Sequence, residues 1–308
     1  MNLVCLIGEQ PVPNLLPILH LKPKQALLVH TNHEGSEKAA QRLRALCSRK
    51  QIAAELLDIG DAYRLERIYD KLWQKVNSQP QVDWCFNLTG GTKLMSLAAA
   101  QLAADLDKSL SCVYYQTEGE RGKQVGKLLY YRFEKRRWIE DPSGGEVLPS
   151  LLKLDDYLRA HLDDYTCRPI SHEQDGWEVE EAVYQALTPH VDEILRNVCP
   201  SGVKDQVEID LLIRIGNQVG VIEVKTGGSG SGKDAVDQLT TVAAREYLGT
   251  YALRFLVTQQ GKESRFKALA ERLRVHVIEL RDYRRGSPLS QQDQHNLLSA
   301  IWQRMPKL

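Results

Sequence analysis

Apolar runs of strand length alternate with helical stretches through the first half of the chain. Five of these runs are expected to be strands, at residues 3–7, 25–31, 53–58, 83–88 and 110–116. Helices are expected between them, ending near Lys50, Val76 and Leu106. Strands that alternate with helices pair in parallel, with the helices covering the sheet. The pattern therefore predicts an α/β, Rossmann-like domain with a parallel sheet, to which residues 127–133 add a further strand.

A glycine-containing turn follows the fourth predicted strand, and a helix is expected directly after it. The turn reads Thr89, Gly90, Gly91, Thr92, Lys93. Glycines let the backbone approach a ligand closely, and a helix N-terminus presents free N–H groups and positive potential. The turn is thus a candidate site for a phosphate or a nucleotide backbone, although a tight turn with a Thr helix cap explains the same residues. The dinucleotide fingerprint G-x-G-x-x-G is absent, so NAD is not expected.

The second half contains two strand-like runs joined by Gly216-Asn217, which is a two-residue hairpin signal. Such a loop pairs Ile215 with Gln218, and counting outward places Asp210 opposite Glu223. Directly opposed side chains in a hairpin lie about 5 Å apart at Cβ. The turn alone therefore predicts two carboxylates close enough to share one Mg²⁺ or Mn²⁺ ion, which prefer hard oxygen ligands.

Lys225 follows Glu223 by two residues and is expected on the same face of its strand. Near a metal it could orient a water or stabilise developing negative charge, as metal-dependent phosphodiester hydrolysis requires. A surface hairpin with a cross-strand Glu208–Lys225 ion pair is the alternative. An amphipathic helix at residues 176–187 supplies a third carboxylate, because Glu180 borders its apolar face while Glu181 lies further round.

The predicted order of elements in the second half is helix, three strands, helix, strand, with the second helix at residues 234–247 and the last strand at 251–257. This order, with its D…ExK pattern, resembles the core of the PD-(D/E)xK, or restriction-endonuclease-like, nuclease superfamily. The resemblance implies that Asp210 and Glu223 hold the metal together with the carbonyl of Val224. It also implies that Lys225 is the catalytic lysine and that Glu180, or alternatively Glu181, is the helix glutamate.

A competing motif lies at residues 227–234, which read Gly-Gly-Ser-Gly-Ser-Gly-Lys-Asp after a strand. This string is close to a phosphate-binding P-loop, but Asp234 stands where a Ser or Thr should bind Mg²⁺, and its carboxylate would repel phosphates. A flexible Gly/Ser loop fits the same residues. A P-loop NTPase is therefore the least favoured of the enzymatic hypotheses.

Two segments of the first half, together with the Glu-Val-Lys strand, resemble the CARF-domain nucleases of type III CRISPR systems. They are residues 8–17 (Gly-Glu-Gln-Pro-Val-Pro-Asn-Leu-Leu-Pro) and residues 87–93 (Asn-Leu-Thr-Gly-Gly-Thr-Lys). The resemblance implies a homodimer that binds cyclic oligoadenylate, usually cyclic tetraadenylate, and is thereby activated to cleave DNA, RNA or both in antiviral defence. By match, the ligand-binding residues are Gln10, Thr31, Thr89, Gly90, Gly91, Thr92 and Lys93.

These patterns divide the chain into a CARF-type sensor domain at residues 1–148, a linker helix within 149–170 and a restriction-endonuclease-like αβββαβ domain at 171–308. The formal net charge is zero, so a nucleic-acid substrate must be held by local groups rather than by overall charge. The six cysteines form no zinc or CxxC spacing and suggest no disulfide framework, so we expect a reducing, cytoplasmic location without a membrane segment. A nucleotide sensor with an inactive, structural nuclease-like half is the alternative function.

Overall fold

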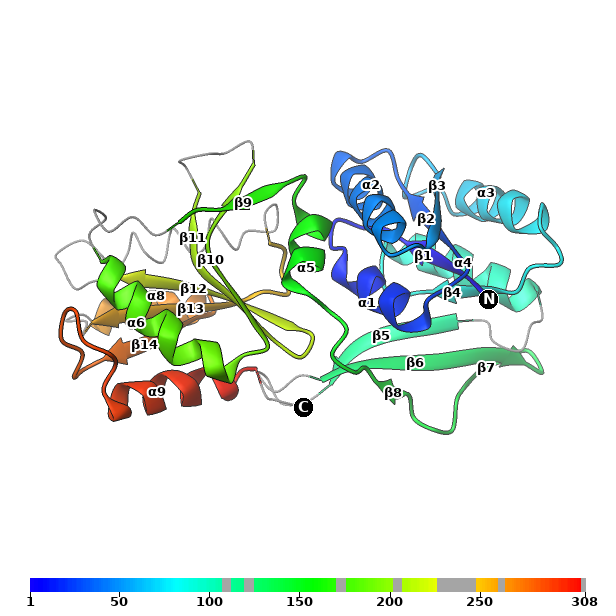
Figure 1. Ribbon diagram of the computed structural model, residues 1–308. Coiled ribbons are helices and arrows are strands. Elements are labelled where there is room, and N and C mark those ends of the chain that lie inside the picture. The colour runs from blue at the N-terminus through cyan, green and yellow to red at the C-terminus, as the bar shows by residue number, and fades with distance from the viewer. Residues whose placement is uncertain are drawn as a thin grey trace. The chain divides into compact units, whose positions relative to one another are not determined.

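The computed structural model describes residues 1–106, 112–118, 125–169, 176–201, 207–225, 248–259 and 264–305. These residues form two compact units, the first comprising Met1–Glu118 and Val125–Leu151 and the second beginning at Leu152. Each unit is built around its own sheet (Figure 1). None of the helices in the described ranges is long and apolar enough to cross a membrane.

The first unit contains a sheet in the order β3-β2-β1-β4-β5-β6-β7, with β8 paired to β6. Neighbouring strands from β3 to β5 in this order are parallel. Strand β6 pairs antiparallel with β5, and β7 and β8 each pair antiparallel with β6. The predicted parallel, Rossmann-like sheet is confirmed. The strands are β1 (Asn2–Leu6), β2 (Gln25–His30), β3 (Ala53–Asp58), β4 (Trp84–Asn87), β5 (Cys112–Glu118), β6 (Val125–Glu134), β7 (Arg137–Glu140) and β8 (Glu146–Val147).

The helices of this unit connect its parallel strands, as the sequence pattern predicts for the last three of them. They are α1 (Val12–Leu21), α2 (Glu34–Arg49), α3 (Leu65–Asn77) and α4 (Lys93–Asp105). The inner strand β1 is buried along its whole length, and α4 packs Met95, Ala99 and Leu102 into the core on one side of the sheet. Burial on both faces explains why these strands read as continuous apolar runs rather than as alternating ones.

Helix α1 is not predicted by the sequence pattern, because it contains proline in its first turn and again at Pro17. Proline has no backbone N–H, so Pro17 leaves the carbonyl of Pro13 without its usual helical donor. The side chain of Asn87 supplies the missing bond, since its Nδ2 lies 2.9 Å from the Pro13 oxygen. A residue at the end of β4 thereby completes a helix that the local sequence disfavours.

The second unit contains a sheet in the order β14-β13-β12-β11-β10-β9, in which β12, β13 and β14 are parallel and the remaining neighbours antiparallel. Its strands are β9 (Tyr165–Cys167), β10 (Glu193–Pro200), β11 (Ile209–Ile215), β12 (Gln218–Lys225), β13 (Leu253–Gln259) and β14 (Val275–Leu280). Its helical elements are α5 (Leu154–His161), α6 (Trp177–Leu187), the 3₁₀ turn η1 (Thr188–His190), α8 (Ser264–Arg272) and α9 (Gln291–Trp302).

Helices α6 and α9 pack their apolar sides into one core with β11, β12 and β13. The predicted order of helix, three strands and a later strand is found as α6, β10, β11, β12 and β13. The helix expected at 234–247 and the Gly/Ser segment at 227–234 lie outside the described residues. Residues 149–170, expected to hold a linker helix, contain α5 and β9, and both belong to the second unit.

Candidate functional site

The β11–β12 hairpin sets two carboxylates opposite each other. Its pairing runs from Ile215↔Gln218 outward to Leu211↔Ile222, which is the register that the turn predicts. Asp210 and Glu223 are the next pair in this register. The strands are almost entirely buried, so the hairpin holds both side chains in a fixed framework.

Both carboxylates are withdrawn from solvent, since Asp210 is 9% exposed and Glu223 only 1%. One oxygen of Asp210, Oδ2, accepts a hydrogen bond from the N–H of Val224 at 2.7 Å. The Nζ of Lys225 forms an ion pair with Oε1 of Glu223 at 2.5 Å. The predicted metal and catalytic residues of this hairpin thus lie together at one end of it.

Burial and mutual repulsion govern the ionisation of this group. Burial raises the pKa of Asp210, although Lys225 and the Val224 N–H act against it. Burial also raises the pKa of Glu223, and the charge of Asp210 raises it further. For Lys225, burial acts to lower the pKa, but the carboxylates of Glu223 and Asp210 outweigh it and the pKa is raised. When both carboxyl groups are ionised, they carry more negative charge than the one lysine beside them balances.

Glu180 on α6 belongs to this group, while its neighbour Glu181 does not. Burial raises the pKa of Glu180 to about 7, with a further contribution from Asp210, so the helix presents this carboxyl toward the hairpin. Glu181 is held elsewhere by Arg196, whose Nη2 lies 2.7 Å from its Oε2. The Arg196 guanidinium also lies 4.1 Å from the ring centroid of Tyr184. Arg196 thus holds Glu181 outside the group, and of the two predicted alternatives Glu180 is the one that faces Asp210.

The alternative cross-strand pair between Glu208 and Lys225 is not what the structure shows. Glu208 pairs with Arg168, Nη1 to Oε2 at 3.4 Å, and Lys225 pairs with Glu223 on its own strand. Arg168 follows β9, so this contact links the edge strand to the start of β11. Sequence reasoning missed Arg168 because forty residues separate it from its partner.

The donors at this centre suit a hard divalent cation. Asp210 and Glu223 provide oxygen ligands, and burial raises the pKa of both, so a bound Mg²⁺ or Mn²⁺ would stabilise their ionised forms. Within the described ranges, however, no three His, Cys, Asp or Glu side chains converge as ligands. A cation here would therefore need donors beyond the two carboxylates. The further donor predicted from the sequence is the carbonyl oxygen of Val224, the residue between Glu223 and Lys225.

A second candidate site lies in the first unit, where the chain turns from β4 into α4. A Cβ at Gly90 would overlap the carbonyl oxygen of Leu6, and Gly91 has a positive φ of 71°. Both positions therefore require glycine for this path. Thr92 caps α4, since its Oγ1 accepts from the N–H of Met95 at 3.3 Å, and Lys93 is exposed at the first helical position.

A buried network of asparagines fixes this turn against the β1–α1 connection. Asn14, fully buried in α1, donates to the Leu6 carbonyl at 2.9 Å and accepts from Asn87 at 2.9 Å. The Oδ1 of Asn87 accepts from the Thr89 hydroxyl at 2.6 Å, and Thr89 Oγ1 accepts from the N–H of Tyr115 at 2.7 Å. The hydroxyl of Thr89 thus holds the turn in place. Asn14 and Asn87 occur in the two segments that carry the CARF resemblance, but the sequence alone assigns them no role.

The remaining predicted ligand residues follow neighbouring parallel strands. Gln10 is half-buried in the connection after β1, and Thr31 is buried directly after β2. The N–H of Thr31 donates to Ser36 Oγ, which donates in turn to the carbonyl of Ile7. The connections after β1, β2 and β4 therefore meet at the carboxyl edge of the sheet, the usual position of ligand sites in open α/β sheets.

Residues 2–139 match the family model of the Card1 CARF domain. The first unit is a Card1-type CARF domain. The predicted resemblance to CARF-domain proteins of type III CRISPR systems is thereby confirmed. In this Card1-type domain, the Gly90-Gly91 turn and the asparagine network occupy the carboxyl edge of the sheet. A search of curated proteins found no match to the chain.

Solved structures extend the likeness beyond the Card1-type domain to nearly the whole chain. Can2 from Sulfobacillus thermosulfidooxidans in complex with cyclic tetra-adenylate is 16% identical with a TM-score of 0.70, covering 97% of this chain and 96% of that one. VC1899 from Vibrio cholerae is 13% identical with a TM-score of 0.71 and the same coverage. A type III CRISPR defence DNA nuclease activated by cyclic oligoadenylate is 16% identical with a TM-score of 0.59, covering 97% of this chain but only 51% of that chain. At these identities the likeness shows a shared two-domain fold.

Proposed function

We propose that the protein is a metal-dependent endonuclease activated by cyclic oligoadenylate, with cyclic tetraadenylate as the first candidate. The observation that carries the proposal is the buried Asp210–Glu223 pair with Lys225 beside it, in a chain whose first unit is a Card1-type CARF domain. The relatives described as bound to or activated by such ligands support the same combination of a sensor and a nuclease.

In this proposal Asp210 and Glu223 would hold Mg²⁺ or Mn²⁺ with the carbonyl of Val224, and the bound cation would supply Lewis-acid chemistry toward a water and the substrate phosphate. The ammonium group of Lys225 then shifts from Glu223 toward the phosphate or the attacking water. Glu180, with a pKa of about 7, sits at a value suited to accepting a proton near neutral pH. The substrate is DNA, RNA or both.

The ligand site is proposed at the carboxyl edge of the first sheet. Backbone N–H groups at the start of α4 and the exposed Lys93 would bind phosphates, while Gln10 and Thr31 would contact the nucleotides. A cyclic, symmetric anion binds best between two copies of the same site, so we propose a homodimer. Binding activates only if it favours one arrangement of the dimer over another.

The alternative, a sensor with a structural nuclease-like unit, is favoured by one observation. The ion pair with Lys225 already balances part of the negative charge of the centre without a cation. In this case Lys225 would be a structural counter-ion, and the protein would bind a ligand without cleaving nucleic acid.

Cleavage assays distinguish the two functions. Single-stranded RNA, single-stranded DNA and supercoiled plasmid are each incubated with Mn²⁺, with and without cyclic tetraadenylate, beside Lys225→Ala and Glu223→Ala variants. We expect cleavage that requires activator, metal and both side chains. Cleavage without activator would leave the nuclease but remove the switch, and ligand binding without any cleavage would establish the sensor.

A further inference from the structure

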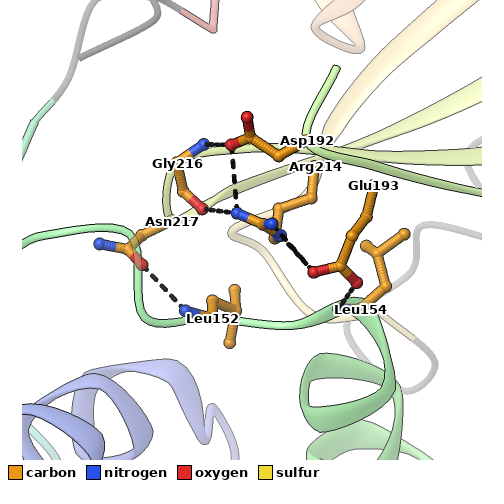
Figure 2. Close-up of polar contacts among 7 residues, drawn as sticks. All are labelled: Leu152, Leu154, Asp192, Glu193, Arg214, Gly216 and Asn217. Carbon is orange, nitrogen blue, oxygen red and sulfur yellow. Dashed lines mark hydrogen bonds and ion pairs between the residues drawn. The ribbon is translucent and has the colours of Figure 1, made fainter. Parts of the chain in front are cut away.

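The turn of the catalytic hairpin is held from one side by Arg214, a β11 residue that is only 8% exposed. Its Nη1 donates to the carbonyl of Gly216 at 2.7 Å and to Oδ2 of Asp192 at 3.2 Å. The same Asp192 oxygen accepts the N–H of Gly216 at 2.7 Å (Figure 2). Both backbone polar groups of Gly216 are thus bonded within this cluster, which fixes the geometry of the turn.

The cluster also reaches the start of the second unit. The Nε of Arg214 donates a hydrogen bond to Oε1 of Glu193 at 2.9 Å, and the N–H of Leu154 donates to Oε2 of the same carboxylate at 2.9 Å (Figure 2). Leu154 is the first residue of α5, whose N-cap residue provides no side-chain bond, so the Glu193 carboxylate caps the helix. In the turn itself, Oδ1 of Asn217 accepts the N–H of Leu152 at 3.1 Å.

The position of these bonds in the chain gives them a second significance. The first unit ends at Leu151, and Leu152 begins the second unit. The residues that enter the second unit are therefore bonded to the turn of the hairpin whose other end carries Asp210 and Glu223. From Ile215 to Asp210 is a distance of about 17 Å along a buried, paired strand. A strand held on both sides moves as a rigid element, so a shift of the turn reaches the carboxylates.

We infer that Arg214 and Asn217 are positioning residues that couple ligand occupancy of the CARF domain to the placement of the catalytic carboxylates. This inference rests on the proposed function. A ligand-induced displacement that reaches Leu152 must either carry the hairpin turn with it or break these hydrogen bonds. Breaking them is costly at Arg214, because separating a buried guanidinium from its carboxylates leaves charge uncompensated.

Asn217→Ala tests the coupling, because it removes the acceptor for Leu152, and Asn217→Asp is the matched control, because it keeps an oxygen at that place. Hydrogen exchange of residues 209–225 is measured with and without cyclic tetraadenylate, together with calorimetric binding and plasmid cleavage. We expect wild type and Asn217→Asp to show altered exchange in both residues 2–139 and the hairpin. Asn217→Ala should bind the ligand equally and keep the change in residues 2–139. It should lose the change in the hairpin, and its ratio of activated to ligand-free cleavage should fall about tenfold.

Arg214→Lys provides a second variant that keeps the positive charge but loses the planar fork that joins Asp192 to Glu193. It should reduce the activation ratio in the same way without changing ligand affinity.

The inference is overturned if hairpin exchange in the wild type does not respond to bound ligand, or if Asn217→Ala is activated like the wild type. It is also overturned if both variants lose activated and ligand-free cleavage by the same factor, which indicates a merely structural role. Failure of the proposed nuclease function can be told apart from failure of the coupling. It shows as a wild-type protein that binds the ligand but cleaves no substrate, and hydrogen exchange in the hairpin of that protein still tests the coupling.

Discussion

Replacing Glu223 by Gln should make the metal-free protein more stable at alkaline pH while removing nuclease activity. Glu223 is buried beside Asp210, and burial together with that neighbouring charge raises its pKa despite the ion pair with Lys225. The folded state therefore penalises the ionised form. A neutral amide of similar shape removes the repulsion and leaves Lys225, which is 31% exposed, accessible to water.

The size of the effect follows from the charges. The Cβ atoms of opposed residues lie about 5 Å apart, and two charges at that separation repel by about 3 kcal/mol at an effective dielectric constant of about 20. The ion pair between Glu223 and the partly exposed Lys225 offsets about 1 kcal/mol of this repulsion. The net gain in unfolding free energy for Glu223→Gln is thus about 2 kcal/mol, which corresponds to a rise in Tm of about 4–8 °C for a unit of this size.

The sign depends on pH in a way that can be measured. Because the pKa of Glu223 is raised in the folded state, its contribution to stability is present below its ordinary pKa and is lost as pH rises through the raised value. Thermal unfolding in EDTA should therefore show equal stability of wild type and variant near pH 4 and a more stable variant at pH 8.

Glu181→Gln is the control, because that carboxylate is paired with Arg196 outside the centre and its loss should lower Tm slightly. Added Mn²⁺ should raise the Tm of the wild type more than that of Glu223→Gln. A lower Tm for Glu223→Gln than for wild type at pH 8 in EDTA would refute the electrostatic argument.

Three further substitutions test other parts of the structure. Gly90→Ala should destabilise the first unit by about 2 kcal/mol or more and abolish calorimetric binding of cyclic tetraadenylate, whereas Gly60→Ala, in open space, should cost about 1 kcal/mol and leave binding intact. Asn87→Leu should cost about 2–4 kcal/mol in urea unfolding, because it leaves buried polar partners unsatisfied. Arg196→Met should cost about 1–2 kcal/mol and raise the pKa of Glu180 in an NMR titration, because Arg196 acts to lower that pKa.

The local apolar pattern and the turn residues were sufficient to predict the parallel sheet of the first unit and the register of the β11–β12 hairpin. The strands β1, β2 and β4 of the first unit are buried apolar runs, and the Gly216-Asn217 turn fixes the β11–β12 register by counting alone. The same count led to Asp210 and Glu223. These features are encoded within a few residues of one another, which is why sequence reasoning finds them.

Features that depend on distant partners were not predicted. Helix α1 was missed because Pro17 argues against a helix unless Asn87 supplies the absent bond. Arg214 reads as an ordinary polar residue in an apolar strand, and its partners Asp192 and Glu193 lie more than twenty residues away. Spacing in the sequence carries no signal for such pairs, since only the folded chain brings them together.

The bond between Asn87 and Pro13 also has a consequence for how the chain folds during synthesis. Its two ends are 74 residues apart, so α1 lacks this bond until β4 has been made and has paired with β1. A ribosome-bound chain that ends before Asn87 would hold the segment Val12–Leu21 as an incomplete helix with an open carbonyl. The N-terminal segment should therefore become resistant to protease only after the β4–α4 turn has emerged from the exit tunnel. The residues that shape the β4–α4 turn would then also time the maturation of the domain's first helix.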